Sequence, residues 1–144
     1  MTVRHKIIPA VFLVLHKGED VLFQRRQNTG HGDGKLSLVG GHVDENESSL
    51  STLCREAMEE IGITINRSDV KFVYVLHRKQ DEEERIDLFF EVKKWNGEIR
   101  ISEPDKCSEL VYYPITRIPP DILPYIKYAL NDINSGISYG EYGW

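Results

Sequence analysis

Three glutamates, Glu56, Glu59 and Glu60, are spaced at i, i+3 and i+4, which places their carboxylates on one face of a helix. Like charges at these spacings destabilise a helix by about 0.2–0.5 kcal/mol per pair. A divalent cation would reverse the sign of that cost, because several carboxylate oxygens on a rigid backbone are hard ligands suited to Mg²⁺ or Mn²⁺. Arg55 could orient one carboxylate by a bidentate contact. Considered alone, such a charge run is more often a solvated helix face.

The residues around this acidic cluster predict a helix over 48–61. Ser48 and Ser49 are good N-caps, and Glu47 places negative charge near the positive end of the helix. Gly62 suits a left-handed stop. One apolar stripe at helical spacing is formed by Leu50, Leu53, Cys54, Ala57 and Ile61. Because the stripe lies on a different face from the glutamates, the helix can pack on a core and still present its carboxylates.

The full spacing from Gly41 to Ile63 carries more information than the glutamates alone. Gly41 is followed by five residues, Glu47, seven more residues and the run Arg-Glu-Ala-Met-Glu-Glu-Ile-Gly-Ile. This pattern resembles the signature of the Nudix hydrolases at every fixed position. Many relatives carry proline before the glycine pair, where this chain has Val39. That difference alters local rigidity and affects none of the expected metal ligands.

The resemblance implies a metal site. By position in the motif, Glu56, Glu59 and Glu60 would hold Mg²⁺, with Mn²⁺ as a possible substitute, and the Gly40 carbonyl would join them. In many relatives an acidic residue in a later loop supplies a further ligand or the general base. Glu103 is the best match by local sequence for that role.

The resemblance leaves the general base open between Glu56, the first choice, and Glu103, the second. A carboxylate bound tightly to a metal has a lowered pKa and accepts protons poorly, so the one further from the metal should serve. Glu109 is the next match to Glu103. The other motif residues would support the site: Arg55 positions the glutamates, Glu47 locks the loop to the helix, and Gly41 and Gly62 are structural.

The order of strands and helices predicts an α/β fold, an α/β/α sandwich with a mixed central sheet, which matches the Nudix-type fold that the resemblance implies. One expected helix, 48–61, covers one side, and a second, 121–134 after Pro119-Pro120, covers the other. Expected strands are 7–16, 21–26, 36–39, 70–77, 86–92 and 110–114, with a short extension at 99–102. The 36–39 strand should deliver Gly40-Gly41 to the catalytic helix. Residues 79–85 read as a charged connection, and the aromatic tail, 135–144, could fray or cover the pocket or a partner subunit.

Four residues are candidates for substrate binding. Arg25 and Arg26 lie near the expected substrate mouth, and strand alternation allows only one of them to face it. Asn28 lies in the glycine-rich loop 27–35, which is either a mobile connection or a substrate-facing loop. His42 could touch a phosphate or protonate a leaving group, although a lone loop histidine is more often simply hydrogen-bonded.

Length and composition are those of one ordinary globular domain, residues 1–144, with two cysteines that we expect to be reduced in the cytoplasm. A net charge of −5 argues against binding of a nucleic acid polymer, and no apolar run is long enough to span a membrane. A homodimer is left open. An acidic site can still hold a small polyanion when metal ions lie between the two.

The expected reaction is hydrolysis of a phosphoanhydride in a nucleoside diphosphate linked to another group. A nucleoside triphosphate, intact or damaged, is the expected substrate and would give a monophosphate and pyrophosphate. ADP-ribose or a nucleotide sugar is the alternative substrate. A non-catalytic nucleotide-binding module on the same fold is a second alternative, but such modules commonly lose the motif carboxylates and this chain has all of them.

Overall fold

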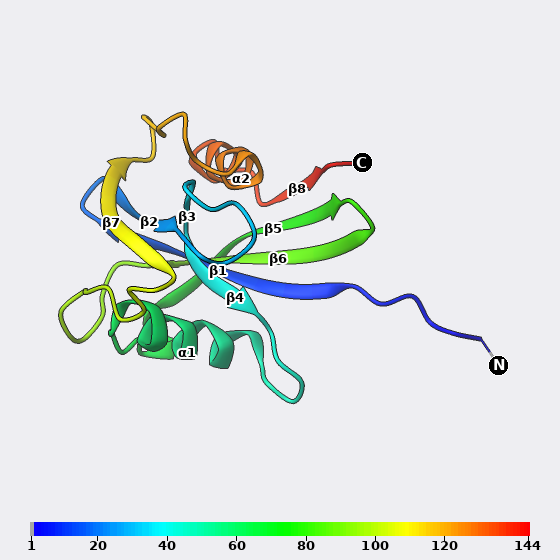
Figure 1. Cartoon of the computed structure of the whole chain (residues 1–144), viewed down its shortest axis with the longest axis horizontal. Helices are drawn as coiled ribbons and strands as arrows, with labels where there is room; N and C mark the ends of the chain where they lie inside the picture. The colour runs from blue at the N-terminus through cyan, green and yellow to red at the C-terminus, as the bar shows by residue number, and fades with distance from the viewer. Residues whose placement is uncertain (1) are drawn as a thin grey trace.

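The computed structural model describes residues 2–144, which form one mixed sheet between two helices (Figure 1). The strands are β1 Ile8–Lys17, β2 Asp20–Arg26, β3 Leu36–Ser37, β4 Val39–His42, β5 Val70–Gln80, β6 Glu83–Val92, β7 Cys107–Pro114 and β8 Tyr139–Tyr142. The helices are α1 Ser49–Ile61 and α2 Pro124–Asn134, with a short 3₁₀ turn at Arg67–Asp69. The expected α/β/α sandwich is therefore confirmed.

Strand β1 is the centre of the sheet. It pairs antiparallel with β2 and β4 and parallel with β6, within the order β3-β2-β1-β6-β5-β8, and β7 pairs with the other side of β2. Its apolar run is buried on both faces because alternate residues enter different cores. Val11, Leu13 and Leu15 pack on the side of α1, whereas Ala10, Phe12 and Val14 pack on the side of α2.

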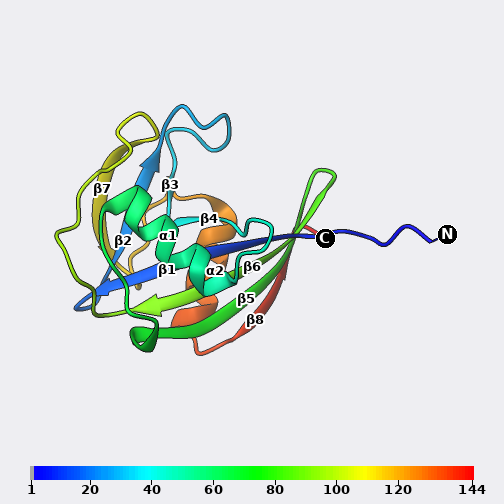
Figure 2. The same ribbon diagram turned by 90° about the horizontal axis from the view of Figure 1, so that it is seen from below.

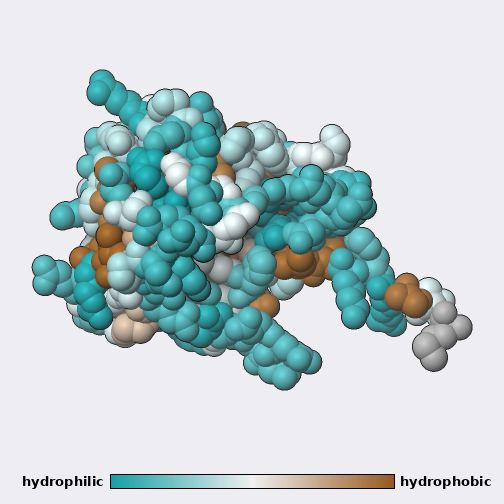
Figure 3. Space-filling model, in the orientation of Figure 1, coloured by the Kyte–Doolittle hydropathy of each residue, from teal (hydrophilic) through white to brown (hydrophobic). Residues whose placement is uncertain are grey.

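The two helices lie on opposite faces of the sheet (Figures 1 and 2). Leu53, Ala57 and Ile61 of α1 are buried against the first core, and Ile126, Ala129 and Leu130 of α2 are buried against the second. The face seen in Figure 3 is mostly hydrophilic, with apolar side chains at separate places. No helix within residues 2–144 combines the length and the apolar character needed to cross a bilayer.

Helix α1 begins and ends where the sequence predicts. The Ser48 hydroxyl accepts from the Ser51 N–H at the N-terminus, and Gly62 at φ 73° ends the helix in the left-handed region. Residues 99–102 do not form the expected strand extension. Instead, the N–H groups of Arg100 and Ser102 donate to the carbonyls of Ile61 and Glu60, which supplies partners to the last turn of α1.

The segment 36–42 differs from the expectation of one strand followed by a glycine turn. β3 pairs with β2, whereas β4 pairs with β1, and the two glycines lie inside β4. Gly40 is opposite Phe12, and a Cβ there would overlap the Val11 carbonyl. The missing side chain therefore permits a close approach of two strands rather than a turn.

The β5–β6 hairpin is longer than predicted, since residues 79–85 are mostly strand and not a loop. The register pairs Lys79 with Glu84, whose opposite charges favour that arrangement, and Gln80 with Glu83. Only two residues turn the chain, with Asp81 at φ 54°. The charged residues 79–85 therefore lie at the end of a hairpin that protrudes from the sheet (Figure 2).

Two further differences concern the C-terminal part of the chain. Helix α2 starts at Pro124, not at Asp121, because proline is favoured in the first turn and the preceding segment is bonded to β3 instead. The tail does not fray or cover the pocket. It forms β8, parallel to β5, and the Trp144 indole N–H donates to the His77 carbonyl at 3.0 Å.

Candidate active site

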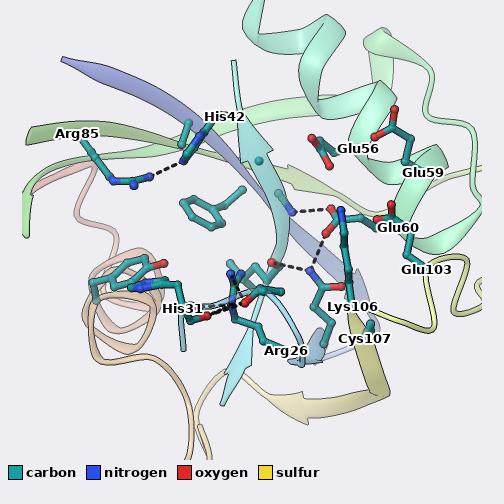
Figure 4. Close-up of a pocket in the computed structure, with 18 of the residues that line it drawn as sticks. Arg26, His31, His42, Glu56, Glu59, Glu60, Arg85, Glu103, Lys106 and Cys107 are labelled. Carbon is teal, nitrogen blue, oxygen red and sulfur yellow. Dashed lines mark hydrogen bonds between the residues drawn. The ribbon is translucent and has the colours of Figure 1, made fainter. Parts of the chain in front are cut away.

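A pocket of about 450 Å³ opens where α1, β4 and the start of α2 approach the central strands. Of the expected site residues, it is lined by Arg26, Gly40, Gly41, His42, Glu56, Glu59, Glu60 and Glu103. Figure 4 shows the four glutamates together on one side of this pocket. The structure thus brings the acidic helix face and the Glu103 loop to the same cavity.

Arg55 is held by the carboxylates around it. Its Nε and Nη2 donate to the two oxygens of Glu47 at 2.9 and 3.0 Å, and its Nη1 donates to Glu56 at 3.0 Å and Glu59 at 3.1 Å. The bonds from Arg55, joined by one from Thr52, lower the pKa of Glu47 to about 2. Glu47 therefore stays ionised and links the loop before α1 to the arginine.

Glu60 is held by the sheet rather than by Arg55. The Gln24 side-chain amide donates to its Oε1 at 2.9 Å, and the Gly40 N–H donates to its Oε2 at 3.1 Å (Figure 4). Burial raises the pKa of Glu60 to about 8, and the neighbouring negative charge of Glu56 adds to the rise. Burial likewise raises the pKa of Glu56, against the lowering effect of Arg55.

These carboxyl groups suit a hard divalent cation. Two adjacent, partly buried acids with raised pKa values are unfavourable as anions, and a cation would remove that cost. In this conformation no three His, Cys, Asp or Glu side chains of residues 2–144 are grouped as a metal site. Arg55 holds Glu56 and Glu59, whereas Gln24 and the Gly40 N–H hold Glu60, so the carboxyl groups are oriented towards different partners.

The raised pKa of Glu60 predicts how the metal-free protein responds to pH. The pKa of Glu60 is 4.5 in the unfolded chain and about 8 in the folded protein, so the folded protein binds this proton more tightly. This group's contribution to the free energy of unfolding is complete below pH 4.5 and is lost as pH rises through 8. With EDTA, the wild type should therefore lose a few kcal/mol relative to Glu60→Gln between pH 5 and pH 8.5.

Urea unfolding of both proteins at each pH measures this difference. Lys71→Gln, on the exposed edge of β5, serves as a control substitution whose pH dependence should match the wild type. Parallel pH dependence in wild type and Glu60→Gln would contradict the assignment.

The four candidate substrate-binding residues fall into two groups. Arg26 and His42 line the pocket, and the Nε2 of His42 accepts from Arg85 at 2.6 Å. Burial, followed by the positive charge of Arg85, lowers the pKa of His42, which keeps the ring neutral as an acceptor. Arg25 and Asn28 lie outside the pocket lining, so the structure does not support the substrate contact expected of them.

Arg25 and Asn28 have other partners. Arg25 pairs with Asp121 at 2.7 Å and with Glu109 at 3.2 Å, because strand alternation turns it away from Arg26. Glu109, which pairs with Arg25, does not line the pocket. Asn28 donates to the Asp105 carbonyl at 3.0 Å and fastens the glycine-rich loop to the Glu103 loop.

Sequence reasoning did not identify several residues that line the pocket, namely Phe12, Gln24, His31, Arg78, Arg85, Lys106 and Tyr125. Gln24 could have been singled out from the sequence, because it is a polar residue directly after an apolar run. In the structure its side chain is only 6% exposed. Asp87 interrupts an apolar run in β6, which is a sign of a buried partner but does not identify Arg78 as that partner. The others come together only through the sheet order.

Comparisons with known proteins agree with this geometry. A family model described as NUDIX domain matches residues 6–131. The 8-oxo-dGTP diphosphatase of Escherichia coli (strain K12) is 28% identical over 127 residues, covering 84% of this chain and 94% of that protein.

Two solved structures are similar in fold. The MutT NUDIX hydrolase from Burkholderia pseudomallei has a TM-score of 0.78 at 23% identity, covering 88% of this chain and 98% of that one. The MutT protein from Methanosarcina mazei Go1 has a TM-score of 0.79 at 21% identity, covering 93% and 97%. Since the family model spans most of the chain, and Glu56, Glu59 and Glu60 of the motif line the pocket, this protein belongs to the Nudix family and is a Nudix hydrolase.

Proposed function

We propose that this enzyme hydrolyses a nucleoside triphosphate to the monophosphate and pyrophosphate, using Mg²⁺. Nudix hydrolases generally act on small nucleotides with divalent cations, and one relative is named for a nucleoside triphosphate, 8-oxo-dGTP. The observation that carries the proposal is the division of the pocket. Glutamates lie on one side, and arginines with two aromatic rings lie on the other, which suits a ligand with a metal-bound polyphosphate and a base.

In this proposal Glu56, Glu59, Glu60 and Glu103 would hold the cation, with the Gly40 carbonyl as a further ligand. When bound, the cation polarises phosphoryl oxygens and lowers the pKa of water. Gln24 and the Gly40 N–H orient Glu60 before substrate arrives, and Arg55 sets the separation of Glu56 and Glu59.

Glu56 would be the general base, with Glu103 as the second candidate. In the metal-free protein burial raises the pKa of Glu56, which favours its carboxylate as proton acceptor provided that it lies further from the cation than Glu103 does. Its contact with Arg55 at 3.0 Å fixes the direction from which it can take a proton from water.

A product assay tests the proposed function. The enzyme is incubated with Mg²⁺ and a panel of nucleoside triphosphates, ADP-ribose and nucleotide sugars. The nucleotide products are separated by chromatography, and phosphate is measured with and without added pyrophosphatase. Phosphate that appears only with pyrophosphatase, from triphosphates alone, supports the proposal. Faster hydrolysis of ADP-ribose or a sugar nucleotide favours the alternative substrate. Binding of nucleotides without turnover would make the protein a binding module.

The two motif glycines predict different effects of an added methyl group. At Gly41 a Cβ would overlap the Glu56 carboxylate, a side chain that can move away, whereas at Gly40 it would overlap the Val11 carbonyl. Gly41→Ala should therefore keep the fold but displace Glu56 and lower kcat by about 10²-fold. Gly40→Ala should mainly lower the free energy of unfolding, by about 1–3 kcal/mol.

Thermal melts and initial rates on both variants separate these effects. A Gly41→Ala enzyme with nearly normal kcat would show that the position of Glu56 does not limit the reaction. A Gly41→Ala enzyme that melts as early as Gly40→Ala would show that the two glycines serve the same structural purpose.

A further inference from the structure

The pocket has a second side whose chemistry is opposite to that of the glutamates. In Figure 4, Arg26, His31, His42 and Arg85 lie away from the acidic group. The lining of this side also includes Phe12, Leu38, Arg78 and Tyr125. The rings of Phe12 and Tyr125 lie edge to face, with centroids 6.2 Å apart. A flat aromatic ligand group would find apolar surface here together with three guanidinium groups.

Most hydrogen-bond acceptors on this second side are already used. The Nε2 of His42 accepts from Arg85, and the His31 carbonyl accepts from Arg26 Nε at 2.7 Å. The Thr29 hydroxyl accepts from Arg26 Nη2 at 3.1 Å. The Tyr125 hydroxyl and the neutral His31 ring can each donate or accept, so neither discriminates between the two kinds of ligand group. What this side offers to a ligand is therefore mainly donors.

Arg78 is the most firmly held of these donors. It is 2% exposed, its Nε donates to Asp87 at 2.7 Å, and its Nη1 donates to Gln80 at 2.6 Å. Its Cζ lies 3.7 Å from the centroid of the Tyr125 ring. Within residues 2–144, Nη2 makes no hydrogen bond to another side chain or carbonyl. The guanidinium is thus held by Asp87, Gln80 and the Tyr125 ring, while its Nη2 can still donate to a ligand.

We propose that Arg78 determines base specificity, donating to the 6-keto oxygen of a purine and disfavouring a 6-amino purine. This inference rests on the proposed function, because it assumes that the base lies opposite the metal-bound phosphates. Arginine pairs well with O6 and N7 of guanine, whereas adenine presents an amino donor at the same place. A buried donor cannot turn to water when it meets another donor, so a mismatched base leaves it unpaired.

The comparison of ITP with ATP isolates the group in question, because the two bases differ at C6 and in the proton on N1. In the wild type, kcat/KM should be at least about 10-fold higher for ITP and GTP than for ATP. Arg78→Lys keeps a positive charge beside Asp87 but removes the free guanidinium nitrogen. It should reduce the ITP preference to within about threefold, mainly by lowering kcat/KM on ITP.

A purely structural role for Arg78 would lower both rates together and leave their ratio unchanged, and this outcome would overturn the proposal. Arg117→Lys, an exposed position outside the pocket, is the matched control and should leave the ratio at its wild-type value. If Arg78→Lys does not fold, the Arg78→Gln/Asp87→Asn pair replaces the ion pair by neutral groups of similar shape and should show the same loss of preference.

Failure of this inference can be distinguished from failure of the proposed function. Equal kcat/KM on ITP and ATP, with pyrophosphate as product, would overturn the role of Arg78 and leave the proposed function standing. If no triphosphate is hydrolysed, calorimetric binding of IMP and AMP to the wild type and Arg78→Lys still tests base preference. Equal affinities of the wild type for the two monophosphates would overturn it.

Discussion

Glu60→Gln is expected to lower kcat by about 10³-fold or more while the enzyme keeps its fold. Glu60 receives hydrogen bonds from the Gln24 side chain and the Gly40 N–H, which hold its carboxyl group in place. Because its pKa is about 8, the side chain is largely protonated at neutral pH without metal, and glutamine is a close neutral analogue. The substitution should therefore spare stability and remove the charge that a cation requires.

Steady-state kinetics with Mg²⁺, together with a thermal melt, measures these two effects. Glu98→Gln is a suitable control, since this glutamate is exposed and lies outside the pocket. In a calorimetric titration, Glu60→Gln should bind Mg²⁺ more weakly than the wild type does, whereas Glu98→Gln should bind it with the wild-type affinity. Turnover by Glu60→Gln close to that of the wild type would refute the ligand assignment.

Asp87→Ala is expected to lower the free energy of unfolding by about 3–5 kcal/mol, the largest effect on stability that we predict. Asp87 is fully buried in β6 and pairs with Arg78, which is itself buried. Removing the carboxylate leaves a guanidinium charge in the core, and among residues 2–144 its remaining partners are Gln80 and the Tyr125 ring. The cost comes from the unpaired charge rather than from the lost contact.

The double variant Arg78→Met/Asp87→Leu separates these two explanations. Replacing both charges by apolar groups of similar volume should recover most of the lost stability, because a buried ion pair contributes little net stabilisation. Urea unfolding of wild type, single and double variants gives the comparison. If the double variant is as unstable as Asp87→Ala, packing around Asp87 matters more than charge.

The acidic half of the site could be predicted from sequence because it is local. One helix with its caps and one loop place Glu47, Arg55, Glu56 and Glu60, and short-range periodicity predicts that placement. The contacts of Glu60 with Gln24 and Gly40 depend on the sheet instead. The same reasoning predicted that Arg25 and Arg26 face opposite ways. It could not say which of them faces the pocket, because the register between β2 and β7 decides that, with an irregularity at this pair.

The other half of the pocket could not be predicted because it is assembled from distant segments. Arg78 meets Asp87 through the pairing of β5 with β6, and Tyr125 reaches Arg78 because α2 covers that face of the sheet. The hairpin was missed for a related reason. A run of charged residues predicts a loop, but here the run is strand, and its cross-strand pair Lys79–Glu84 has opposite charges that favour this pairing.

The position of β8 has a practical consequence for handling this enzyme. β8 pairs with Val75–Arg78, so the last residues of the chain protect the edge of the strand that carries Arg78. An unprotected edge strand recruits strands from other molecules. Removal of residues 138–144 should thus promote aggregation, and an affinity tag is better placed before residues 2–7, which extend away from the sheet (Figure 1).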